Sequence, residues 1–199
     1  MPKKVLKIGH RGANGYCLGN TLACFEKSIR LGVDMIELDV HLKDGKLFVI
    51  HSIKDLSRRT PVLKNVFDLV KKRVKIDIEL KGRGAAEPVA KLIKEYIKKG
   101  WKESDFLVSS FRVKELKNFK KQGLKVKMVF IARKKRKIIK DPDFYYINIA
   151  LKIAKKKLIN KLHNQGFKIF VWTANKKKDI KRLMSFGIDG IISDYPDKL

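Results

Sequence analysis

The sequence predicts a compact α/β barrel of the TIM (β/α)8 type, with a β-hairpin extension after the second strand. Three observations lead to this fold class. Short apolar runs alternate with helical segments along the 199 residues, which is typical of a parallel sheet. Eight such runs can be placed, and eight strand–helix units argue for a closed barrel. A turn follows the second run and leads into a return strand, which predicts the hairpin.

Eight segments have the composition of buried parallel strands, because they are short and rich in valine, isoleucine, leucine and phenylalanine. They are residues 5–9, 35–40, 74–81, 106–110, 126–132, 144–150, 168–174 and 190–193. The second strand is followed by the tripeptide KDG, in which Gly45 supplies the left-handed residue of a tight turn. The run 46–51 then returns and completes the hairpin.

Helical periodicity fills most intervals between these strands. The clearest case is 20–32, where Leu22, Phe25 and Ile29 recur at helical spacing and Gly32 follows the last turn. The other helices are expected at 61–73, 86–100, 113–123, 156–166 and 177–187. Neither an interdomain linker nor a low-complexity segment interrupts the alternation. We therefore expect residues 1–199 to form a single domain.

The composition limits the class of protein. Apolar residues make up 44% of the chain, which is enough for a sizeable core, and no apolar run reaches the 18 residues of a membrane span. The N-terminus lacks the pattern of a signal peptide. Cys17 and Cys24 have no neighbouring cysteine or histidine that would complete a zinc site, so we expect free thiols. These features together predict a cytoplasmic protein.

The formal net charge of +28 is the most unusual bulk property. It is compatible with binding to nucleic acid or to anionic membranes. Lysines are spread over the whole chain, however, so we favour a compositional bias, with weak anionic-membrane association through the basic surface and no specific binding of nucleic acid. The best candidate for a local basic patch is ARKKRKIIKD at 132–141.

Three carboxylates fall where a parallel barrel places its chemistry, at the carboxyl ends of strands. Glu37 and Asp39 are two residues apart and therefore share one face of their strand. Glu79 occupies the corresponding part of the next barrel strand. Carboxylates that converge repel each other unless a cation lies among them. An all-oxygen ligand set suits Mg²⁺ or Ca²⁺ better than zinc.

Histidines and cations accompany these acids. His10 follows the first strand and His51 ends the hairpin, and such a pair can take and give a proton beside a metal. Arg11 and Lys81 would complement an anion, and Trp172 could form an aromatic wall. The combination describes the cleavage of a phosphodiester. Two further histidines are expected to stand outside the site, namely His41 and His163.

These motifs resemble those of the glycerophosphodiester phosphodiesterase family. The matching stretches include GHRGANG, GVDMIELDVHLKDGKLFVIHS, IDIELK, VWTAN and GIDGIISDYP, in order, between residues 9 and 196. The resemblance implies a TIM barrel that hydrolyses small anionic glycerophosphodiesters to sn-glycerol 3-phosphate and an alcohol, in glycerophospholipid metabolism. It also implies one divalent cation, with Mg²⁺ or Ca²⁺ expected and Mn²⁺ as a further candidate.

The resemblance assigns roles residue by residue. The catalytic histidines are His10 and His51, and the metal ligands are Glu37, Asp39 and Glu79. Residues expected to hold the phosphate or line the pocket are Arg11, Lys81, Phe111 and Trp172. Which histidine is the acid and which the base stays open. The nucleophile is water or a glycerol hydroxyl, and the second would give a cyclic phosphate first.

The sequence departs from the family pattern at three places. Gly19 stands where the family usually has an acid, and Ser52 stands where it usually has aspartate. The segment after His51 also runs almost directly into the next helix, whereas the family inserts a longer covering segment. An open pocket favours, as an alternative, a lysophospholipase D-like activity. A second alternative is a non-catalytic barrel that binds anions.

Overall fold

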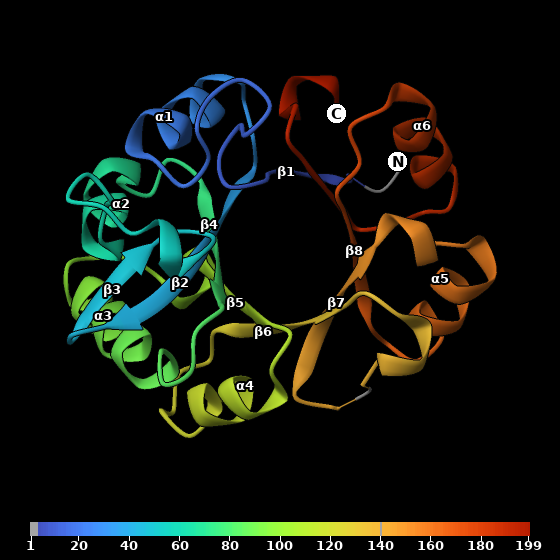
Figure 1. Cartoon of the computed structure of the whole chain (residues 1–199). Coiled ribbons are helices and arrows are strands. Elements are labelled where there is room, and N and C mark those ends of the chain that lie inside the picture. Colours follow the sequence, from blue (N-terminus) through green and yellow to red (C-terminus); the bar gives the residue numbers. More distant parts are fainter. Residues whose placement is uncertain (1–3, 140) are drawn as a thin grey trace.

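Eight parallel strands form a closed ring in the computed structural model, which describes residues 4–139 and 141–199 (Figure 1). The barrel strands are β1 (Leu6–Gly9), β2 (Met35–Lys43), β4 (Lys75–Leu80), β5 (Phe106–Ser110), β6 (Lys127–Ala132), β7 (Phe144–Ala150), β8 (Lys168–Trp172) and β9 (Gly190–Ser193). The ring closes because β1 pairs in parallel with both β2 and β9. The predicted fold class is confirmed.

The predicted hairpin lies outside this ring. Strand β3 (Lys46–Val49) pairs antiparallel with the part of β2 that extends beyond the barrel, and Val40 faces Val49 across the pair. Asp44 and Gly45 both have positive φ angles, 48° and 70°, which is the backbone that a tight hairpin turn requires. The hairpin therefore stands at the mouth, the end of the barrel where the strands finish.

Six α-helices lie around the barrel in the part of the chain that the structure describes. They are α1 (Leu22–Arg30), α2 (Leu63–Val70), α3 (Ala86–Lys98), α4 (Val113–Lys120), α5 (Lys156–His163) and α6 (Lys177–Ser185). The expected eight strand–helix units are thus not all complete. Only a short 3-10 turn, Lys135–Lys137, lies between β6 and β7, and another, Pro196–Lys198, follows β9.

The barrel interior changes from apolar to polar along its axis. The part of the interior farther from the mouth is filled by apolar side chains that form one buried cluster: Ile8, Met35, Leu107, Val129, Phe170 and Ile192. Side chains two and four residues further along the same strands share the inward face. Met35 is therefore followed inward by Glu37 and then Asp39, so β2 begins in the core and ends in the polar mouth.

The structure corrects one expectation about the cysteines. Cys17 and Cys24, predicted to be free thiols, are joined in a disulfide with their Cα atoms 5.5 Å apart. Cys17 lies in the loop after β1 and Cys24 in the first turn of α1, where Thr21 caps the helix by accepting the Cys24 N–H. In the described residues, no helix is both long and apolar enough to cross a bilayer.

Candidate active site

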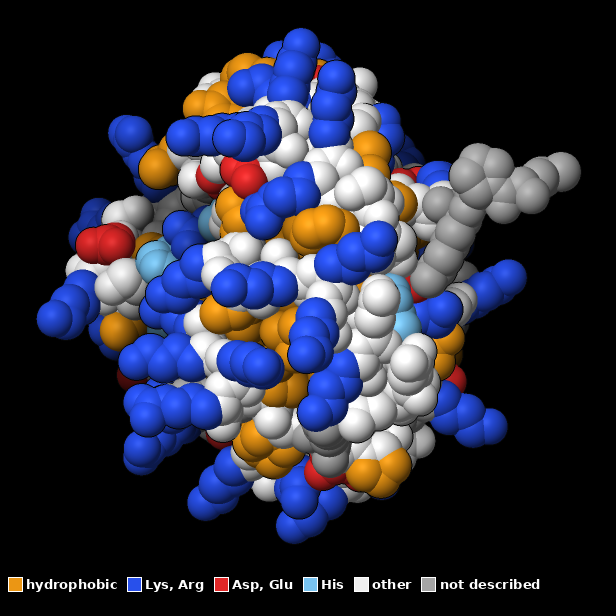
Figure 2. All heavy atoms as spheres, turned by 90° about the vertical axis from the view of Figure 1, so that its right-hand side faces the viewer, with side chains coloured by type: hydrophobic (Ala, Val, Ile, Leu, Met, Phe, Trp, Pro, Cys, Tyr) orange, Lys and Arg blue, Asp and Glu red, His pale blue; other side chains and the backbone are white. Residues whose placement is uncertain are grey.

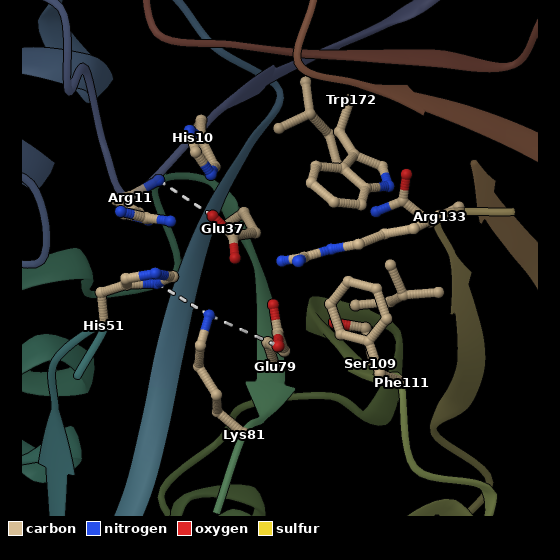
Figure 3. Close-up of a pocket in the computed structure, with 13 residues that line it drawn as sticks. His10, Arg11, Glu37, His51, Glu79, Lys81, Ser109, Phe111, Arg133 and Trp172 are labelled. Atoms are coloured by element: carbon tan, nitrogen blue, oxygen red, sulfur yellow. Dashed lines mark hydrogen bonds and ion pairs between the residues drawn. The ribbon is translucent and has the colours of Figure 1, made fainter. Parts of the chain in front are cut away.

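A pocket opens at the mouth of the barrel, and most residues expected in the site line it (Figure 3). These are His10, Arg11, Glu37, His51, Glu79, Lys81, Phe111 and Trp172. Asp39 lies behind the lining, 1% exposed, and contacts several of them. Six strands or their following loops contribute, so residues from 10 to 172 meet in one place. The grouping expected from the strand ends is present.

The carboxylates of Glu37, Asp39 and Glu79 form the centre of the pocket. Each offers an oxygen that lies within 4.8 Å of the other two, and all three side chains are buried. The register explains this, because Asp39 on β2 pairs directly with Glu79 on β4. Burial and the nearby Asp39 charge raise the pKa of Glu37 to about 7 and that of Glu79 to about 8.

Asp39 differs from the other two acids because cations surround it. Arg11 Nε lies 3.0 Å from Asp39 Oδ2, and Lys81 Nζ lies 2.8 Å from Oδ1. The Asn20 amide donates to Oδ2 at 2.9 Å. Burial opposes ionisation, but a hydrogen bond with His51 and the cations of Lys81 and Arg11 outweigh it and hold the pKa of Asp39 far below its usual range. Asp39 is therefore ionised while its two neighbours resist ionisation.

An unusual backbone in the β1–α1 loop aims two of these groups. Arg11 and Asn20 have positive φ angles of 50° and 60°, which non-glycine residues rarely adopt. Gly12 has φ 91°, and a Cβ there would lie 2.7 Å from the Cys24 carbonyl oxygen. The Arg11 N–H donates to Glu37 Oε2 at 2.9 Å. The loop thus turns sharply so that one residue, Arg11, contacts both acids of β2.

The donor set fits a hard divalent cation. The three convergent oxygens are buried, and the described residues bring neither histidine nor cysteine into the cluster that they form. Two of the carboxylates have raised pKa values because they are buried and a like charge lies beside them, and a cation among them would favour their ionised forms. Glu37, Asp39 and Glu79 are therefore suited to hold Mg²⁺, Ca²⁺ or Mn²⁺.

His10 has a partner that the sequence pattern did not identify. Its Nδ1 lies 2.6 Å from Asp194 Oδ1, in the loop after β9. Asn175 and Asn14 also donate to Asp194 and fix its carboxylate. Burial alone would lower the pKa of His10, but the Asp194 hydrogen bond and the Glu37 charge outweigh it, so the pKa is raised. Asp194 is therefore placed to orient His10 and to stabilise its protonated form.

His51 reaches the pocket from the hairpin. The Ile50 N–H donates to the Asp39 carbonyl oxygen at 3.0 Å, which continues the hairpin to the residue before the histidine. His51 Nδ1 lies 2.7 Å from Lys81 Nζ and 3.3 Å from Asp39 Oδ2. Its side chain is 45% exposed, against 15% for His10. Both histidines lie on the side of the acids where Arg11 lies, with His10 above and His51 below it in Figure 3, and His51 is the more open to solvent.

Two departures from the family pattern have local explanations. A side chain at Gly19 would clash with the side chain of Asn14 and would lie 3.0 Å from the Arg11 Cβ. The usual acid would therefore fit here only if the side chain of Asn14 moved aside. Ser52 caps the 3-10 turn Ile53–Asp55, because its Oγ accepts the Lys54 N–H at 3.3 Å.

An aromatic wall with an arginine faces the acids across the pocket. Phe111 and Trp172 pack edge to face with ring centroids 5.7 Å apart. The guanidinium of Arg133, the first residue after β6, lies 5.0 Å from the Phe111 ring and 5.5 Å from the Trp172 ring. In Figure 3 its side chain extends from this wall toward Glu37. In the sequence Arg133 stands out only as part of a basic run, although its place directly after a strand was a usable signal.

Two histidines lie outside the catalytic grouping, as predicted. His41 Nε2 lies 3.3 Å from the His51 carbonyl oxygen on the hairpin. His163, at the end of α5, lies 2.8 Å from Asp189 at the opposite end of the barrel. Neither side chain lines the pocket.

Comparisons with known proteins agree with this geometry. The model of the glycerophosphoryl diester phosphodiesterase family matches residues 10–76 and 61–198. A glycerophosphodiester phosphodiesterase of Caldanaerobacter subterraneus is 31% identical over 98% of this chain and 96% of its own length. One of Bacillus altitudinis is 31% identical over 96% of this chain and 95% of its own. Human lysophospholipase D GDPD1 is 24% identical over 96% of this chain and 84% of its own.

Solved structures share the fold. An Oleispira antarctica phosphodiesterase in complex with the product sn-glycerol-3-phosphate has a TM-score of 0.82, with 21% identity over 96% of this chain and 93% of that one. A glycerophosphodiester phosphodiesterase of Thermotoga maritima has a TM-score of 0.74, with 23% identity over 99% and 97% of the two chains.

Proposed function

Because this chain belongs to the glycerophosphoryl diester phosphodiesterase family, and is therefore an enzyme, we propose that it hydrolyses glycerophosphodiesters to sn-glycerol 3-phosphate and an alcohol in glycerophospholipid metabolism. The observation that carries the proposal is the convergence of three buried carboxylates with His10 and His51 in one pocket. The product complex of the Oleispira antarctica phosphodiesterase supports the same product class. A non-catalytic anion binder would have no need of this complete set.

In this proposal Glu37, Asp39 and Glu79 hold one divalent cation, Mg²⁺ or Ca²⁺, with Mn²⁺ as a further candidate. When bound, the cation supplies positive charge that polarises the phosphoryl group and offsets charge in the transition state. Arg11 and Lys81 already lie at the edge of the acid cluster, where they would bind the remaining phosphate oxygens. Arg133 would bind the phosphate from the opposite wall.

The two histidines would divide the proton transfers. His10 has a raised pKa and a buried hydrogen bond to Asp194, so we assign it to protonate the leaving alkoxide. His51 is more exposed and would take the proton of the attacking hydroxyl. That hydroxyl belongs to water or to the neighbouring glycerol carbon, and the second route passes through a cyclic phosphate.

Two buried polar atoms in the pocket lining favour a substrate that carries hydroxyl groups. Trp172 Nε1 and Asn148 Oδ1 are buried and have no hydrogen-bond partner among the described residues. Both residues line the pocket. A buried polar atom without a partner is costly, and glycerol hydroxyls can both donate and accept. We therefore place the glycerol group against Trp172 and Asn148, with Phe111 as the neighbouring wall.

A lysophospholipase D-like activity is the second candidate function. The observation in its favour is a groove that shares Arg11 and His51 with the pocket and continues between the β1–α1 loop and the segment after β3. Leu18, Val49 and Pro61 line it. A long apolar substituent on the substrate could lie there. The similarity to human lysophospholipase D points the same way.

A paired assay tests both functions. Release of choline from glycerophosphocholine and from lysophosphatidylcholine would be measured in EDTA and after adding back Mg²⁺, Ca²⁺ or Mn²⁺. We expect metal-dependent turnover of glycerophosphocholine, and a loss of several orders of magnitude in His10→Ala and His51→Ala. His163→Ala, at the other end of the barrel, is the matched control. Near wild-type turnover in either site variant, or full activity in EDTA, would contradict the proposal.

The cytoplasmic location stays a prediction. The Cys17–Cys24 disulfide weighs against it, because disulfides persist mainly in oxidising compartments.

A further inference from the structure

Charge is distributed unequally between the two ends of the barrel. The loops that precede strands, at the end opposite the mouth, carry most of the loop carboxylates: Asp34, Glu103, Asp105, Asp141, Asp143 and Asp189. Several of these form ion pairs, as Lys4 does with Asp34, Lys117 with Asp141 and His163 with Asp189. These carboxylates offset part of the positive charge at this end, which also carries lysines that form no ion pair within the described residues: Lys98, Lys102, Lys121 and Lys125.

The mouth presents cations without such partners. They lie in loops that follow strands and are exposed: Arg58, Arg59, Arg83, Arg112, Lys134 and Arg136. Within the described residues, none of these six side chains forms an ion pair with a carboxylate. The first part of the basic run expected at 132–141, with Arg133, Lys134 and Arg136, belongs to this rim, whereas Asp141 lies at the opposite end; residue 140 and the side chain of residue 137 lie outside the described part. Figure 2 shows lysines and arginines continuing over the flank formed by α5 and α6.

An apolar side chain projects from the same rim. Leu18, in the β1–α1 loop, is 80% exposed, the highest exposure of any large apolar residue described, and its neighbour Tyr16 is 47% exposed. The disulfide from Cys17 to Cys24 fixes the adjacent backbone to α1. Tyr16 donates a hydrogen bond to Asp197 at 2.9 Å. The loop is therefore held firmly while leucine points away from the core.

We propose that the mouth of the barrel docks on the surface of an anionic phospholipid bilayer, with the rim cations on lipid phosphates and Leu18 entering the interface. An isolated cationic rim would attract any polyanion. Leu18 is exposed and lines one groove with the rim residue Arg59. This combination is better matched to a membrane interface, which offers both charge and an apolar layer. A nucleic acid has no apolar layer in which Leu18 could be buried. Docking in this orientation turns the pocket toward the lipid. The membrane proposal does not depend on whether the protein hydrolyses glycerophosphodiesters.

Sedimentation with vesicles tests the proposal. Vesicles of equal parts phosphatidylglycerol and phosphatidylcholine would be compared with pure phosphatidylcholine at about 0.1 M salt. The rim variant replaces four cations by glutamine, namely R83Q, R112Q, K134Q and R136Q. The matched control makes the same charge change at the opposite end, namely K98Q, K102Q, K121Q and K125Q. Leu18→Ser tests the apolar contact separately, and thermal unfolding checks that each variant folds.

We expect binding to the anionic vesicles only, weakened by salt. The rim variant should lower the partition coefficient at least about tenfold and the matched control much less, because basic groups contribute only near the surface. Leu18→Ser should lower it about tenfold, from the lost burial of one leucine. Equal losses in rim and control variants would overturn the oriented docking. So would unchanged binding of Leu18→Ser together with tighter binding to duplex DNA, which would indicate a nucleic-acid surface instead.

Discussion

Replacing Asp194 by asparagine tests the proton-donor role of His10. The change keeps the shape of the side chain but removes the charge that lies 2.6 Å from His10 Nδ1. A hydrogen bond between charged groups contributes about 1.5–3 kcal/mol. Its loss therefore corresponds to about a tenfold to hundredfold fall in turnover if the protonated histidine is the acid. The fall comes from the chemical step, so the KM should change little.

The sign of the pH effect follows from the raised pKa of His10. Burial is the largest single effect and lowers that pKa, but the Asp194 hydrogen bond, together with the charges of Glu37 and Asp194, outweighs it, so the pKa is raised. A general acid acts in its protonated form, so activity falls as the pH rises through its pKa. Without the Asp194 charge the pKa drops, and the alkaline limb of the pH–rate profile should move to lower pH.

The assay is the pH dependence of kcat with glycerophosphocholine in saturating metal. Asp197→Asn is the matched control, because Asp197 lies three residues further along the same segment and accepts the Tyr16 hydroxyl outside the pocket. An unmoved alkaline limb in Asp194→Asn would refute the assignment of His10 as the acid. A limb that moves equally in both variants would show a general charge effect instead.

Three further outcomes follow from the site. Burial raises the pKa of Glu37 to about 7 and of Glu79 to about 8, so metal must displace protons, and the thermal shift caused by Ca²⁺ or Mn²⁺ should be larger at pH 8 than at pH 6. Without metal, the raised pKa values of these carboxyl groups mean that the free energy of unfolding falls as the pH rises toward 8. Glu79→Gln should therefore raise the unfolding temperature in EDTA at pH 8, while it lowers activity about a hundredfold or more. An unchanged melting curve would contradict the cost of burying the Glu79 charge. Arg133→Met should raise the KM about tenfold through the lost phosphate contact, whereas its exposed neighbour Lys134→Met should not, as steady-state kinetics will show.

Strand periodicity was enough to predict the inward-facing carboxylates. Glu37 and Asp39 share a face because side chains alternate along a strand, and parallel strands that all end at one mouth bring Glu79 beside them. The ends of the predicted strands also placed the two histidines, because His10 directly follows the first strand and His51 ends the predicted return strand.

Contacts made by loop residues could not be predicted in this way, because side chains in loops do not alternate with a regular period. Asp194 directly follows β9, so its place at the mouth could be predicted, but its hydrogen bond to His10 could not. Asn20 contacts Asp39 through a turn whose direction depends on tertiary packing. The disulfide from Cys17 to Cys24 likewise depends on a loop that folds back onto the first turn of α1. Spacing along the chain carries no signal for such contacts.

The hairpin makes one of the two proposed catalytic histidines structurally independent of the barrel ring. The eight-stranded ring closes without β3, so its hydrogen bonds do not depend on the length of the chain between β2 and β4. His51 is nevertheless supplied by that excursion, while His10 is anchored to the ring through Asp194. Insertions or deletions after His51 can therefore reshape the substrate side of the enzyme, and leave the proposed metal ligands and His10 on an unaltered scaffold.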